Sequence, residues 1–205
     1  MRNFVHPTAV LGPTVQLSDG VEIGPFCVIG LPDYQKTSRK TKQAESAHAF
    51  AATIIEPGCQ IYSHSYIGIG TSIGPETRVD SHGYVGSRCR IESSVTIEYG
   101  ARIYNDVTVG TRSTVSGFVC NSVSIGSDCE VHGSLVHARR GPGMEAAPIL
   151  EEGVFVGTGA IVIGGVRLFR SACLAAGSVL TRDAASAILY KGNPARPSGP
   201  SPNWR

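Results

Sequence analysis

Branched aliphatic residues recur at every sixth position from Ile55 to Val115 without a break. The position four residues after each of them is also restricted, because it is always a small or β-branched residue. A fixed short period of this kind is typical of a β-solenoid, in which no single repeat can bury its own apolar face. One large and one small inward position in each hexad fit a narrow three-sided prism. Residues three hexads apart are therefore expected to lie above one another on the same face.

The hexads begin at Leu11 and continue, with two interruptions, to Leu180. We predict an all-β fold, a parallel β-helix of about eight coils, in which each coil contains three hexads. A single domain is expected over residues 1–196, followed by a short Pro-rich tail at 197–205.

Two stretches lack the hexad pattern, residues 31–52 and 138–149, and we expect both to leave the coil as loops. The first loop carries four basic residues, which are Lys36, Arg39, Lys40 and Lys42. Long loops in compact folds are often functional. This loop is either a solvated segment or an arm that reaches the phosphates of a ligand or a neighbouring subunit.

Composition excludes some classes of function. The net charge is +2, which gives no case for nucleic-acid binding. The N-terminus has no apolar signal segment and the chain has no long apolar run, so we expect a cytoplasmic protein without a membrane partner. Four of the six cysteines, Cys27, Cys59, Cys89 and Cys129, fall at the small inward position and none belongs to a CxxC pair. They are predicted to be packing residues.

The phase of the hexads slips by two residues between Val115 and Ile125, and in the new frame His137 stands on an aliphatic position. This histidine also borders the second loop. A polar residue that breaks the core pattern where the coil opens is a candidate functional residue. Its imidazole titrates near neutrality and can remove a proton from an attacking hydroxyl or amine. The alternative is a residue at the loop edge without chemistry.

His64 and His82 lie in matching strings, Ser63–Gly68 and Ser81–Gly86, which also contain Tyr66 and Tyr84. Their spacing of three hexads predicts that the imidazoles and the phenol rings stack on successive coils. Both histidines occupy a turn position where glycine is common, and histidine tolerates the left-handed conformation better than most residues. They are therefore either turn residues or an aromatic wall that binds a sugar acceptor, or one of them is the base itself.

The aliphatic-Gly-x-x-small-x hexad resembles that of the hexapeptide-repeat acyltransferases. The stretch from Val136 to Ile149 is similar to the active-site segment of the galactoside and maltose O-acetyltransferases, in which a histidine precedes Pro-aliphatic and the return to the coil. The resemblance implies a left-handed β-helix and a homotrimer with sites between adjacent prisms. It also implies that His137 is the general base. Glu145 in the same segment is grouped with the acceptor-binding candidates, as a carboxylate that could orient the imidazole.

The last coils resemble the closing coils of the same acetyltransferases, in the strings Val156–Ala160, Ala175–Asp183 and Gly192–Arg196. The resemblance implies acetyl-CoA or another acyl-CoA as co-substrate. It places contacts to the cofactor at Thr158, Gly159, Ala160, Ala176, Ser178, Thr181, Arg182 and Arg196. Leu168-Phe169-Arg170 departs from the pattern, because the class usually has Ile-Gly-acidic there.

The sequence therefore favours an acyltransferase that acts on a hydroxyl or amine of a sugar, a nucleotide-linked sugar or a similar small polar acceptor. A zinc enzyme like the γ-class carbonic anhydrases is an alternative, since His132 and His137 have the spacing of two metal ligands. No third histidine lies at a matching earlier position, so no metal is expected. A non-catalytic scaffold is the third alternative.

Overall fold

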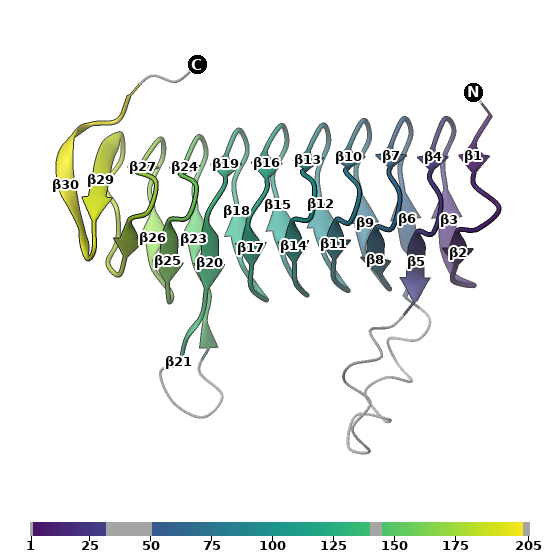
Figure 1. Cartoon of the computed structure of the whole chain (residues 1–205), viewed down its shortest axis with the longest axis horizontal. Helices are drawn as coiled ribbons and strands as arrows, with labels where there is room; N and C mark the ends of the chain where they lie inside the picture. The colour runs from purple at the N-terminus through teal and green to yellow at the C-terminus, as the bar shows by residue number, and fades with distance from the viewer. Residues whose placement is uncertain (1, 32–50, 140–144, 203–205) are drawn as a thin grey trace.

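The computed structural model describes residues 2–31, 51–139 and 145–202 as a row of stacked coils (Figure 1). These residues form thirty short strands and no helix. Among them, therefore, no helix is present that could span a membrane. The basic residues of the predicted loop 31–52 lie outside the described residues.

Three parallel sheets form the sides of a prism, and each coil contributes one strand to each side. Sheet A contains β1 (Phe4–Val5), β4 (Glu22–Ile23), β7 (Gln60–Ile61), β10 (Arg78–Val79), β13 (Thr96–Ile97), β16 (Thr114–Val115), β19 (Glu130–Val131), β24 (Phe155–Val156), β27 (Cys173–Leu174), β29 (Ile188–Gly192) and β30 (Ala195–Pro200). Only β30 is antiparallel to its neighbour in this sheet.

Sheet B contains β2 (Val10–Leu11), β5 (Val28–Leu31), β8 (Tyr66–Gly68), β11 (Tyr84–Val85), β14 (Arg102–Ile103), β17 (Phe118–Val119), β20 (Ser134–Val136), β25 (Ile161–Ile163) and β28 (Val179–Leu180). Sheet C contains β3 (Val15–Leu17), β6 (Thr53–Ile55), β9 (Ser72–Ile73), β12 (Arg90–Ile91), β15 (Thr108–Val109), β18 (Ser124–Ile125), β23 (Ile149–Leu150) and β26 (Arg167–Leu168). We name the turns AB, BC and CA corners, after the sheets that they join.

The predicted inward positions form the core. Every aliphatic residue of the central hexads, from Ile55 to Val115, is buried. The pairing also follows the predicted register, since Val79 lies beside Ile97 and Ile97 beside Val115 in sheet A. About nine coils stack in this way, one per strand of the nine-stranded sheet B, which is one more than the hexads predicted.

The small inward residues connect successive coils. The hydroxyl of Thr71 donates a hydrogen bond to the carbonyl of Gly86 at 2.7 Å and accepts one from the backbone N–H of Cys89 at 3.0 Å. All six cysteines are buried thiols, which confirms the packing role predicted for four of them. The Cys89 thiol donates to the carbonyl of Tyr104 at 2.9 Å. Burial raises the pKa values of Cys59 and Cys89 to about 11.

Two parts of the sequence prediction need correction. Inside the prism, Val119 and Leu135 take the inward positions of β17 and β20, so His137 does not occupy an aliphatic position as predicted. It follows β20 instead. At the C-terminal end the coil continues past Leu180, because Ala184 and Tyr190 are also buried inward. Strand β30 includes residues 197–200, which were predicted as tail.

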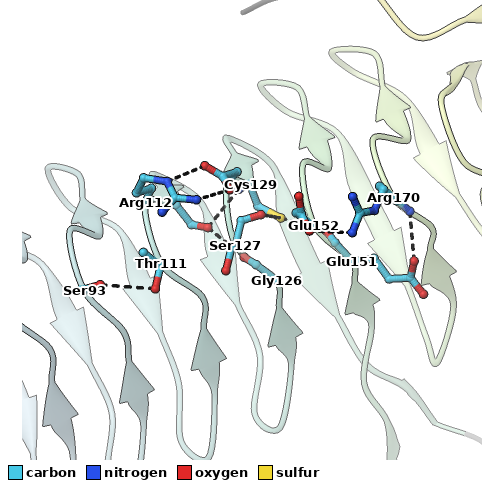
Figure 2. A network of polar contacts seen from close by, with 11 residues as sticks. Ser93, Thr111, Arg112, Gly126, Ser127, Cys129, Glu151, Glu152 and Arg170 are labelled. Atoms are coloured by element: carbon cyan, nitrogen blue, oxygen red, sulfur yellow. Dashed lines mark hydrogen bonds and ion pairs between the residues drawn. The ribbon is translucent and has the colours of Figure 1, made fainter.

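The three corners differ in character. Ion pairs connect successive coils at the CA corner, where Arg112 binds Asp128 at 2.7 Å and Arg170 binds Glu152 at 2.8 Å (Figure 2). Both interruptions of the hexads occur at the BC corner, after β5 and after β20. The second one begins with a two-stranded antiparallel hairpin, β21 (Ala138–Arg139) with β22 (Glu145–Ala146), which projects from the prism (Figure 1).

Candidate functional site

A groove of about 370 Å³ lies on the outer face of sheet B. Its walls come from β8, β11, β14 and the adjoining corners. The residues that line it are His64, Tyr66, His82, Gly83, Tyr84, Arg102 and Tyr104. Four of the five predicted acceptor-binding residues are therefore brought together, and two more, Arg102 and Tyr104, join them.

Two columns of stacked rings form the walls of this groove. His64 and His82 stack with ring centroids 5.0 Å apart and planes 15° apart, and Tyr66 and Tyr84 stack at 4.9 Å and 10°. The predicted stacking is thus confirmed. Rings that stack on one another leave mainly their edges toward the groove, and a lining of apolar ring carbons with phenol and imidazole polar atoms suits sugar rings and nucleobases.

Backbone geometry explains why histidines occupy this corner. His64 and His82 have φ values of 61° and 62°, in the left-handed region that histidine enters more readily than bulky or β-branched residues. A turn of this kind directs each side chain outward from the AB corner, one coil above the other. The turn role and the wall role predicted for these histidines are therefore compatible.

Arg102 supplies a positive charge to the groove. It follows Tyr84 in the same outward register of sheet B and is exposed. Within the described residues it has no carboxylate partner, whereas Arg88 forms an ion pair with Asp106 at 2.7 Å. A guanidinium that is always charged and not already paired is suited to a phosphate or carboxylate. The register of the repeat could have identified it from the sequence.

His137 lies half-buried at the BC corner. Its Nε2 lies 2.8 Å from the backbone carbonyl oxygen of Asn121. A carbonyl can only accept, so Nε2 carries the hydrogen and Nδ1 is the basic nitrogen of the neutral ring. Asn121 itself is fixed, because its side-chain oxygen accepts the backbone N–H of Asn105 at 3.0 Å. The hexad pattern gives no signal for this hydrogen bond between Asn105 and Asn121.

The groove and His137 share one edge of the prism. Tyr104 and His137 both lie where sheet B turns into the BC corner, directly after strands β14 and β20, which are separated only by β17. Two strand spacings correspond to about 10 Å along the axis. Thr181 and Arg182 lie two spacings further along, after β28, and both are exposed. This edge therefore carries, in order, the Tyr104 end of the groove, an imidazole and an exposed cation.

The other predicted cofactor residues lie elsewhere. Thr158, Gly159 and Ala176 are exposed at the AB corner rather than beside His137. Ala160 and Ser178 point inward and are 0% and 2% exposed, so their side chains face the core, and their contact with a cofactor stays a prediction. The Ser178 hydroxyl accepts the N–H of Gly192 instead.

Two further predicted residues stay untested. Arg196 is exposed on β30, at the C-terminal end of sheet A, and its guanidinium donates to the carbonyl of Ala195 at 3.0 Å. It therefore lies away from the BC corner. Glu145 begins β22, opposite Arg139, and only its backbone is described.

The zinc alternative loses its ligand pair. His132 precedes β20 at the AB corner and His137 follows it at the BC corner, so the two imidazoles do not converge. Across residues 2–31, 51–139 and 145–202, no cluster of three or more His, Cys, Asp or Glu residues could hold a metal ion.

Comparison with known proteins supports the fold and the resemblance. No family model matches the chain. An acyl-[acyl-carrier-protein]–UDP-N-acetylglucosamine O-acyltransferase of Thermodesulfovibrio yellowstonii is 28% identical over 139 residues, which cover 66% of this chain and 51% of that enzyme. The chain thus matches about half the length of this relative. The corresponding protein of Brucella ovis is 32% identical over 83 residues, which are 40% of this chain and 23% of the relative.

Solved structures extend the likeness to almost the whole chain. The UDP-N-acetylglucosamine acyltransferase of Francisella novicida superimposes with a TM-score of 0.62 over 96% of this chain and 70% of its own, at 17% identity. A second crystal structure of a UDP-N-acetylglucosamine acyltransferase gives 0.67 over 96% and 73%, at 18% identity. The chain therefore has the left-handed β-helix fold of these acyltransferases.

The superposition on these two structures confirms the predicted left-handed β-helix. Right-handed crossovers are the rule between parallel strands, so periodicity alone could not have given this handedness. The curated members of the hexapeptide-repeat family that match the chain are named as transferring acyl groups from an acyl-carrier protein to UDP-N-acetylglucosamine.

Proposed function

We propose that the protein transfers an acyl group from a thioester to a hydroxyl or amine of a nucleotide-linked sugar. The observation that carries this proposal is the aromatic groove with Arg102, whose Tyr104 end lies on the same edge as His137. The stacked rings suit a nucleobase or sugar and the guanidinium suits a diphosphate. The acceptor named for the relatives, UDP-N-acetylglucosamine, has all three parts.

His137 would act as the general base. With its Nε2–H held by the carbonyl of Asn121, Nδ1 can take the proton from the acceptor as it attacks the thioester carbonyl. The proton then passes to the departing sulfur, which leaves as a thiol. Imidazole suits both steps because it titrates near neutrality.

The donor is either a coenzyme A thioester or a thioester of an acyl-carrier protein. The carrier protein is the donor named for the relatives, whereas the closing coils resemble those of CoA-dependent acetyltransferases. In either case Thr181 and Arg182 would contact the donor, and their position on the same edge as His137 supports this assignment. A phosphate of the donor would pair with Arg182.

A homotrimer stays part of the proposal. Thr158 and Ala176 lie at the AB corner and Arg182 at the BC corner, so residues with the same predicted role are divided between two corners. Contact between two prisms can join the AB corner of one copy to the BC corner of another. Sedimentation of the purified protein should give three times the mass of one chain, and a monomer would contradict this assembly. A cytoplasmic location likewise remains a prediction.

The test is a transfer assay with matched histidine variants. Acetyl-CoA and acetyl-loaded carrier protein are each supplied with UDP-N-acetylglucosamine and with amino-sugar nucleotides, and the acylated product is measured by mass spectrometry. His137→Gln keeps an N–H for the Asn121 carbonyl but loses the base, so kcat should fall about 10²- to 10⁴-fold. The KM for the acceptor should stay unchanged.

The control is His6→Gln, a half-buried histidine at the first coil that does not line the groove and lies at the opposite end of the stack from Thr181 and Arg182. It should keep wild-type kcat. Product formation at the wild-type rate by His137→Gln would contradict the assigned base. Absence of product with every donor and acceptor pair would contradict the proposed reaction.

A further inference from the structure

The AB corner is shorter at two successive coils. The inward residues on the two sides of an AB corner are usually six positions apart in the sequence. Val115 and Val119 are only four positions apart, and so are Val131 and Leu135 at the next AB corner. Glycine makes this possible, because a Cβ at Gly117 would collide with the carbonyl oxygen of the following coil.

The short corners bring three side chains of complementary chemistry together. Ser116 and His132 follow β16 and β19, neighbouring strands in register, and the Ser116 Oγ lies 2.8 Å from the His132 Nδ1. On the other side of the ring, the Glu130 carboxylate lies 3.5 Å from Nε2. A hydroxyl, an imidazole and a carboxylate thus stand in sequence.

One arrangement of the hydrogens agrees with both contacts. Ionised Glu130 can only accept, so it favours the ring hydrogen on Nε2. The unprotonated Nδ1 of His132 then accepts the hydrogen of the Ser116 hydroxyl. A serine whose proton is directed at an imidazole, with a carboxylate behind that imidazole, is the arrangement that activates a nucleophile.

The cluster is accessible and separate from His137. The His132 side chain is 25% exposed and the Glu130 side chain 47%. The Phe155 ring lies 5.8 Å from the imidazole, between centroids, and supplies an apolar surface beside it. The next residue, Gly133, lies directly against the backbone of the turn that contains Thr158. A Cβ at Gly133 would contact the carbonyl oxygens of Gly157 and Ala160 in that turn.

We propose that Ser116, His132 and Glu130 form a second reactive site, in which Ser116 accepts an acyl group from a thioester or a carboxylic ester and passes it to water. The Ser116 Oγ forms a bond to the carbonyl carbon, and the bond from that carbon to sulfur or to the ester oxygen breaks. The proton moves from Oγ to His132 Nδ1 and on to the leaving group, which departs as a thiol or an alcohol.

Water completes the cycle. It gives a proton to His132 as it attacks the acyl-serine, and the proton then returns to the Ser116 Oγ as the acid leaves. The net reaction converts a thioester and water into a carboxylic acid and a thiol. This site does not depend on the acceptor groove or on His137, so it stands or falls independently of the proposed transfer.

The probe is a fluorophosphonate, which phosphonylates an activated serine and releases fluoride. Peptide mapping of the labelled wild-type chain should place the adduct on Ser116, and this measurement requires no variant to fold. Labelling should be abolished in Ser116→Ala and slowed at least about a hundredfold in His132→Gln. Ser124→Ala removes an exposed serine of sheet C and should label at the wild-type rate.

A second readout uses p-nitrophenyl acetate. Wild-type protein should release an initial burst of p-nitrophenol equal to one per chain, and acid-quenched protein should carry an acetyl group on Ser116. Thermal melting of each variant shows whether the coil is intact. No adduct on Ser116 in folded wild-type protein, or equal labelling of His132→Gln, would overturn the proposal and leave these residues as a clamp between coils.

Discussion

Replacing Tyr84 by alanine removes the central ring of the groove wall. The Tyr84 ring stacks on Tyr66 at 4.9 Å and lies 5.6 Å from Tyr104, so the change breaks two aromatic pairs. Such pairs contribute about 0.5–1.5 kcal/mol each, which predicts a loss of about 1–3 kcal/mol in the free energy of unfolding. A base or sugar that stacks on this wall contributes about 1–3 kcal/mol of binding energy. The dissociation constant for UDP-N-acetylglucosamine should therefore rise about 5- to 150-fold.

Two variants separate binding from stability. Tyr84→Phe retains the ring and should bind the nucleotide sugar nearly as tightly as wild type. Tyr62→Ala removes a ring that is 42% exposed and does not line the groove, so its affinity should be unchanged. Isothermal titration gives the affinities and thermal unfolding the stabilities. The reasoning is refuted if Tyr84→Ala binds like wild type while folded, or if Tyr62→Ala weakens binding equally.

Three further predictions concern charge, backbone and thiols. Arg102→Ala should weaken UDP binding about 10- to 150-fold and leave uridine binding unchanged, because a charge-assisted hydrogen bond contributes about 1.5–3 kcal/mol; equal loss for both ligands in titration would contradict the phosphate role. Gly117→Ala should lower the melting temperature more than Gly100→Ala, because a Cβ at Gly117 collides with the Gly133 carbonyl oxygen, whereas a Cβ at Gly100 meets no atom within 4 Å and is opposed only by the φ of 69°. Burial raises the pKa values of Cys59 and Cys89 from 9.0 to about 11. Between these pH values the unfolded chain loses the two thiol protons and the folded chain keeps them, so the free energy of unfolding decreases as pH rises from about 9 to 11. Melting curves between pH 9 and 11 measure this loss of stability, and the loss should be smaller in Cys89→Ala. In a separate test, the buried thiols of the folded protein should resist alkylation by iodoacetamide at pH 9.

The period of six residues predicts most of the fold, because each inward residue satisfies the same packing requirement. Ile97 pairs with the residues one coil before and one coil after it, as the spacing requires. The period also predicted the stacking of His64 on His82. These successes have one cause, since parallel stacking in register converts sequence spacing directly into contact.

The prediction was wrong where the turn, rather than the strand, sets the geometry. A slip of two residues does not show which corner is shortened or that a second short corner follows, so His137 was placed on an inward position that Leu135 occupies. The last coil was missed because Tyr190 replaces a branched aliphatic residue and satisfies its hydroxyl by accepting the backbone N–H of Ala185.

The candidate site was predicted only in part, for a related reason. Tyr66 and Tyr84 were found because their strings repeat, whereas Arg102 occupies the same register in a string that does not repeat. The hydrogen bond from His137 to the Asn121 carbonyl involves a backbone acceptor, and no side-chain pattern reveals it.

The central claim is that one edge of the prism combines an acceptor groove with the base His137. A single-turnover experiment tests it most directly, with radiolabelled acetyl thioesters of coenzyme A and of acyl-carrier protein each mixed with excess protein and UDP-N-acetylglucosamine or an amino-sugar nucleotide. We predict that label passes to the nucleotide sugar in wild-type protein, at a rate that falls about 10²- to 10⁴-fold in His137→Gln. Equal rates in the two proteins, or no labelled nucleotide sugar with any pair, would contradict it.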